Sequence, residues 1–88
     1  MLMSLAGFGQ WYKSRLVADE TLIKEYKHSF VVNTCNNAIF KLIQGRFNIK
    51  TSDYTTKKRY ALRTPYLERN IRFKKHKLTE VETYLKAL

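Results

Sequence analysis

Residues 57–77 read KKRYALRTPYLERNIRFKKHK, and the rest of the chain can be interpreted from this stretch. Nine of its residues are Lys or Arg and only Glu68 is acidic, so it carries +8 of the chain's formal charge of +10. Tyr60, Tyr66 and Phe73 are interleaved with the cations. Because a block of one charge sign repels itself, we expect the stretch to face a strongly acidic partner.

A single Thr64–Pro65 pair divides this basic stretch into two parts. The residue before a proline disfavours α geometry, whereas Thr as N-cap followed by Pro at the first helical position is a good helix start. We therefore predict two helices, over residues 54–62 and 65–77. The second has only a thin apolar line, which predicts that it needs a partner in order to fold.

Further helical segments are predicted from apolar spacing along the chain, over residues 1–16, 19–29, 37–47 and 79–88. Phe30-Val31-Val32 favours a short extended segment. Thr79-Glu80-Val81-Glu82 has the pattern of a capping box, with Thr79 as the N-cap of the last helix. The sequence thus predicts an all-α protein, with four to five short helices in an extended, open arrangement and little independent core.

The predicted organisation is a single small domain. It comprises an N-terminal helical extension, residues 1–29, and a basic helical RNA-binding region, residues 30–88. The chain has 88 residues, 17 of them basic and 7 acidic. No run of about 18 apolar residues is present, so no membrane span is expected.

Few residues in the chain have the spacing that catalysis or metal binding requires. Cys35 is the only cysteine, and neither His28 nor His76 has a metal ligand at a suitable spacing. Cys35 also lacks an activating base, which favours a structural thiol. We therefore expect no enzymatic activity, no cofactor, no metal and no small-molecule substrate.

Nucleic acid is the partner that the basic stretch favours, because Arg can grip phosphate in a bidentate manner and aromatic rings can stack on unpaired bases. An acidic protein, an anionic lipid surface or a plain solvated face are the alternatives. The predicted RNA-binding residues are Lys57, Lys58, Arg59, Tyr60, Arg63, Arg69, Arg72, Lys74, Lys75 and Lys77.

From Phe30 onward the order of features resembles the bacterial-type small-subunit ribosomal protein twenty-one family, particularly its mitochondrial members. The counterparts are Phe30-Val31-Val32, the helix from Asn36 to Ile43, the basic cluster Lys57-Lys58-Arg59-Tyr60, Pro65, and a second basic helix that follows it and contains Arg69 and Arg72. The family's usual Tyr-Glu-Lys-Pro is replaced here by Leu62-Arg63-Thr64-Pro65, and residues 1–29 have no counterpart.

This resemblance implies a structural protein of the ribosomal small subunit that binds rRNA and neighbouring ribosomal proteins, in a ribonucleoprotein active in translation. The expected location is the mitochondrial matrix, in the mitochondrial ribosome. One alternative is a small basic accessory subunit of a mitochondrial inner-membrane complex, respiratory or ATP synthase. Another is a small DNA-binding protein of a phage or nucleoid.

Overall fold

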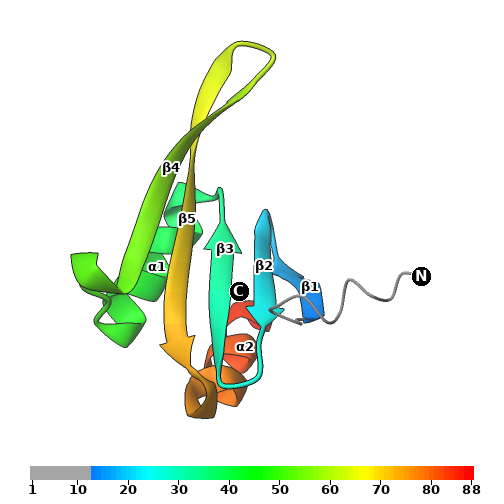
Figure 1. Ribbon diagram of the computed structural model, residues 1–88, viewed down its shortest axis with the longest axis vertical. Helices are drawn as coiled ribbons and strands as arrows, with labels where there is room; N and C mark the ends of the chain where they lie inside the picture. The colour runs from blue at the N-terminus through cyan, green and yellow to red at the C-terminus, as the bar shows by residue number, and fades with distance from the viewer. Residues whose placement is uncertain (1–12) are drawn as a thin grey trace.

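The computed structural model describes residues 13–88, which form an antiparallel sheet covered on one face by two helices (Figure 1). The sheet order is β1-β2-β3-β5-β4, and every neighbouring pair of strands is antiparallel. The strands are β1 (Lys13–Ala18), β2 (Thr21–Glu25), β3 (Ser29–Thr34), β4 (Tyr54–Ala61) and β5 (Thr64–Lys74). The helices are α1 (Asn37–Phe47) and α2 (Leu78–Lys86), and 3₁₀ turns cover Thr51–Asp53 and Lys75–Lys77.

The prediction of an all-α protein is therefore wrong, and the basic stretch is the clearest error. Residues 64–74 form the strand β5, in which Ile71 and Phe73 are buried while Arg72 between them is exposed. This alternation has the period of a strand. The preceding segment, 54–62, was predicted to be helical, but residues 54–61 form the edge strand β4.

The helix predicted over residues 19–29 is also wrong, because this segment contains β2 and a turn into β3. Thr21 and Ile23, two residues apart, are both fully buried. Ile23 pairs with Val32 of β3. Strand β2 lies in the predicted extension, residues 1–29, and β3 lies almost wholly in the predicted basic region, residues 30–88, so strands from both regions are neighbours in one sheet. Apolar residues that fit a helical stripe also fit a strand in so short a segment.

Helix α1 begins and ends where the sequence predicted, at residues 37 and 47. The Asn36 side chain accepts a hydrogen bond from the backbone N–H of Ile39 at 3.1 Å, as an N-cap should. At the other end Asn48 adopts the left-handed conformation, with φ of 55°, and so completes the helix as a C-cap.

Helix α2 overlaps the predicted helix at 79–88, but its start differs from the prediction. The N-cap position is Lys77 rather than Thr79, and it makes no side-chain cap hydrogen bond. Glu82, which was predicted to close a capping box, instead accepts two hydrogen bonds from Arg15 of β1, at 2.7 and 2.8 Å. This pair ties the last helix to the first described strand.

A packed hydrophobic core fills the space between the helices and one face of the sheet, so the prediction of little core is wrong. Phe30 and Phe73 stack there with ring centroids 5.1 Å apart. The buried residues of this core are Val17, Ile23, Phe30, Val32, Ile39, Phe40, Ile43, Ile71, Phe73, Val81 and Leu85.

The helix predicted over residues 1–16 falls largely outside the described residues. Residues 13–16 belong to β1, the edge strand opposite β4. Among residues 13–88, the two helices are too short and too polar for either to cross a lipid bilayer.

Candidate nucleic-acid interface

The hairpin of β4 and β5 continues beyond the rest of the sheet and projects from it (Figure 1). Thr34 and Arg69 form the last pair between β3 and β5, and from Glu68 to Thr64 strand β5 pairs only with β4. We call residues 57–68 the arm. Five residues per strand at about 3.4 Å each give a projection of about 17 Å.

Every residue from 55 to 67 is exposed. Packing in the core therefore does not account for the residue types found in the arm. The arm contains four cations, Lys57, Lys58, Arg59 and Arg63, against one acid, Glu68. A solvated two-stranded ribbon is marginally stable by itself, and it must therefore be supported where it leaves the sheet.

Each face of the arm carries at least one cation and an aromatic ring, since residues paired across the strands point to the same side. One face has the pairs Lys57–Glu68 and Arg59–Tyr66. The other face has Lys58 and, next along that face of β4, Tyr60 with 65% of its surface exposed. The Lys58 Nζ lies 6.0 Å from the centroid of the Tyr60 ring.

The arm is braced at its root on one side of the sheet by Glu68. The Nδ2 of Asn33, on β3, donates to Glu68 Oε2 at 2.7 Å, and Arg59 Nε donates to Oε1 at 2.8 Å. These hydrogen bonds, chiefly that from Asn33, lower the pKa of Glu68 below its ordinary value. The carboxylate is therefore ionised at neutral pH and is engaged in holding the arm.

A second brace lies on the helix-covered side and is made by Arg69. Its Nη1 donates to Asn37 Oδ1 at 2.7 Å, at the start of α1. Its guanidinium carbon lies 4.2 Å from the centroid of the Phe40 ring, within the range of a cation–π contact. With these braces, the root of the arm is held to β3 on one side of the sheet and to α1 on the other.

The ten residues predicted to bind RNA are separated into two groups by this geometry. The side chains of Lys57, Arg63, Arg72 and Lys74 make no hydrogen bond or ion pair with residues 13–88, so their charges are free for a partner. Lys58 and Tyr60 are exposed on the arm, and Arg59 is exposed there although paired with Glu68.

The remaining three predicted residues have structural contacts. Arg69 is the brace at Asn37. The Nζ of Lys75 lies 3.1 Å from a Glu25 carboxylate oxygen and donates to the backbone carbonyl of Tyr26, which ties the end of β5 to β2. Lys77 is 3.7 Å from Glu80 within the first turn of α2.

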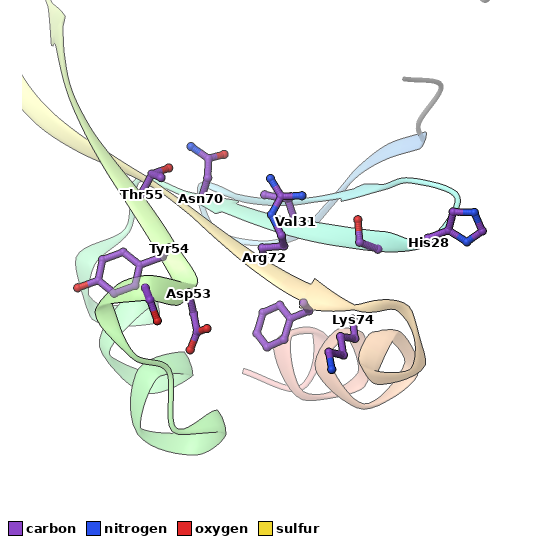
Figure 2. Close-up of a pocket in the computed structure, with 11 residues that line it drawn as sticks. His28, Val31, Asp53, Tyr54, Thr55, Asn70, Arg72 and Lys74 are labelled. Atoms are coloured by element: carbon purple, nitrogen blue, oxygen red, sulfur yellow. The ribbon is translucent and has the colours of Figure 1, made fainter. Parts of the chain in front are cut away.

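A pocket lies at the end of β5 farthest from the arm tip, where β4 begins (Figure 2). Thr55, Asn70 and Arg72 project to one side of the strands there, whereas Asp53 and Lys74 project to the other. The polar groups therefore do not converge on one ligand. Arg72 extends the cationic surface from the arm root along the uncovered face of the sheet.

Leu62 at the tip of the arm is a feature that the sequence interpretation did not single out. It is 98% exposed, and it occupies a two-residue turn between Ala61 and Thr64. Asn-Gly or Asp-Gly is the usual sequence indication of such a turn. Leu62-Arg63 gives no such indication, so neither the hairpin nor the exposed position of Leu62 at its tip could be predicted from the local sequence.

Other reactive side chains do not form a site within residues 13–88. No group of three or more His, Cys, Asp or Glu side chains there is arranged to hold a metal ion. Burial, together with the nearby charges of Glu68 and Glu20, raises the pKa of the Cys35 thiol. A raised pKa makes Cys35 a poor nucleophile.

Comparisons of this chain with protein-family models, with curated proteins and with solved structures found no match. The resemblance to the ribosomal family therefore stays a prediction. One of the features that carried it, a second basic helix after Pro65, is the strand β5.

Proposed function

We propose that this protein binds nucleic acid through the arm, with Arg72 and the uncovered face of the sheet as a second contact. The observation that carries the proposal is the arm itself. It projects about 17 Å from the sheet, its residues are exposed, and three of its cations, Lys57, Lys58 and Arg63, are in no ion pair within the described chain.

The physical argument is one of charge and position. A polyanion gains free energy from such a surface because each phosphate contacted by Lys or Arg releases condensed counterions. The two braces at Asn33 and Asn37 hold the arm before binding, which lowers the entropy lost on association. Exposed tyrosines beside the cations suit contacts with sugars and bases.

Binding isotherms of the full chain with a fluorescent nucleic acid, recorded from low to moderate salt, test the proposal. We expect affinity to fall steeply with salt. In the triple variant K57A/K58A/R63A, the slope of log K against log salt should become less steep by about 0.9 for each phosphate contact removed. Binding that is absent, or insensitive to salt, contradicts the proposal.

The matched control removes the same charge from elsewhere on the surface. Lys27, Lys41 and Lys50 are exposed and lie outside the arm, so K27A/K41A/K50A has the same net charge as the arm variant. This control should keep most of the wild-type slope. An equal loss in both triple variants would show that net charge alone, and not the arm, attracts the ligand.

The narrower ribosomal role is a separate proposal, and the cell fraction in which the chain is found tests it. A small-subunit protein of a mitochondrial ribosome should co-sediment with ribosomal particles and their rRNA. An accessory subunit of an inner-membrane complex should instead sediment with the detergent-solubilised complexes. Either outcome identifies the assembly, whereas the binding isotherms identify the surface.

A further inference from the structure

The turn at the tip of the arm has an unfavourable backbone conformation for the residues it contains. Leu62 has φ of 51° and Arg63 has φ of 74°, as the two central residues of a type I′ turn do. Asn and Gly adopt such angles readily, whereas a leucine with its Cβ does so at an energetic cost. Such outliers are concentrated at functional sites.

The side chain that this turn presents is apolar and 98% exposed. The other large exposed hydrophobic side chains of the arm, Tyr60, Tyr66 and Leu67, are 39 to 65% exposed. A turn that only had to close the hairpin and stay soluble would be better served by Asn-Gly. The combination of strain and exposure suits a side chain that a partner buries.

We propose that the partner is duplex DNA and that Leu62 is a wedge that enters the base stack when the arm lies in a groove. This inference deepens the proposed function and rests on it. Arg63 beside the wedge, and Lys57 and Lys58 along the arm, would contact the phosphates that flank the groove. Apolar wedges in minor-groove proteins partly unstack a base step and kink the duplex, and β-ribbons bind in either groove.

Dimensions favour B-form DNA over the other nucleic acids. Its major groove is about 12 Å wide and admits a two-stranded ribbon, and both grooves are about 8 Å deep. The arm, about 17 Å long, can therefore bring its tip to the bases while its root stays outside the backbone. The major groove of A-form RNA is too narrow and deep for side chains to read, and a single strand offers no groove.

The experiment uses the full chain and a DNA duplex of about 30 base pairs with a donor and an acceptor dye at its ends. We expect binding to raise energy transfer, because a wedge bends the duplex by about 20–90°. L62N, whose Asn tolerates positive φ, should bind about tenfold more weakly, the effect of leaving one leucine unburied, and should not bend the duplex. L62M keeps an apolar tip and should behave as the wild type.

Further arms of the experiment separate this inference from the proposed function. The salt slope of L62N should equal that of the wild type, because all cations remain. Bending by L62N equal to the wild type, or tighter binding to double-stranded RNA, single-stranded RNA or phosphatidylserine vesicles than to the DNA duplex, overturns the wedge. Salt-dependent binding of any nucleic acid would still leave the proposed function standing.

Discussion

The guanidinium of Arg69 joins the root of the arm to the start of α1, because its Nη1 donates to Asn37 Oδ1 at 2.7 Å. The same guanidinium lies over the ring of Phe40, a buried core residue. Arg69 was predicted from sequence to contact RNA. Its position gives it a structural role at the root of the arm, and the RNA contact stays a prediction.

Arg69 and Arg72 lie three residues apart on β5 and should respond differently to the same substitution. R69A should lower the free energy of unfolding by about 1–2 kcal/mol, since it removes a hydrogen bond and a cation–π contact. R72A should leave stability unchanged within about 0.5 kcal/mol and reduce the salt slope of nucleic-acid binding. Urea unfolding and binding isotherms of both variants measure this contrast, which a stability loss in R72A alone would contradict.

Replacing Arg63 by glycine should move stability and binding in opposite directions. Arg63 has φ of 74°, which glycine adopts freely, so R63G should raise the unfolding free energy by about 1 kcal/mol. The same change removes a free cation from the arm tip and should weaken nucleic-acid binding. R63K is the matched control, since it keeps both the charge and the strained backbone. R63G that is less stable than R63K would contradict the account of the turn.

Glu68, the single acid of the arm, should limit affinity for a polyanion. E68Q removes its charge but retains an oxygen that can accept the hydrogen bond from Asn33. We expect binding to tighten and the salt slope to steepen by about 0.9, because Arg59 is released to contact a phosphate. E68A, which also removes the acceptor, should in addition lower stability. Unchanged binding in E68Q would show that this face of the arm does not contact the ligand.

Acid should weaken the attachment of β1 to α2. The hydrogen bonds from Arg15 lower the pKa of Glu82 from its ordinary value of 4.5 to about 2. Because the folded pKa is the lower one, the stabilisation is fully present above pH 4.5 and is lost as the pH falls toward 2. It amounts to about 1–3 kcal/mol, since Glu82 is partly exposed and solvent screens the pair.

The variant R15M removes this attachment at every pH. Its unfolding free energy should lie below the wild type at pH 7, and the difference should shrink between pH 4.5 and pH 2. Hydrogen bonds from Lys75, and to a lesser extent from Arg15, also lower the pKa of Glu25. Because the Glu25–Lys75 pair remains in R15M, this variant should keep part of the wild type's acid sensitivity. A stability difference that does not change with pH would contradict the role given to the Arg15–Glu82 pair.

Local features of the sequence were sufficient to locate α1. Asn36, the apolar positions Ile39 and Ile43, and Asn48 act within one segment, and each has the role that a helix assigns to it. The concentration of charge between residues 57 and 77 was also evident from composition. These properties depend on neighbours in the chain and not on the tertiary structure.

The strands could not be predicted in the same way, because they are stabilised by pairing between distant segments. Ile71 and Phe73 are buried only because β5 lies beside β3 and beneath the helices. The turn that joins β4 to β5 has Leu-Arg where Asn-Gly would have indicated a hairpin. Thr64–Pro65, a good helix start by local rules, is instead the first pair of residues of β5.

The roles of the charged residues likewise depend on tertiary contacts. The sequence treats Arg69, Arg72 and Lys75 alike, as cations in one basic block. In the fold, Arg72 is free on the uncovered face of the sheet, Arg69 contacts α1, and Lys75 contacts β2. Charge counting therefore located the segment but could not separate the cations that are free on the surface from those that have structural contacts.

The most direct test of the arm as the binding surface is a two-dimensional ¹H–¹⁵N NMR titration of the full chain with a DNA duplex. The account predicts that the largest shift changes fall on residues 57–68, with smaller ones at Arg72, and that the outer faces of α1 and α2 are unaffected. Changes concentrated on the helices, with the arm resonances unmoved at saturation, would contradict it.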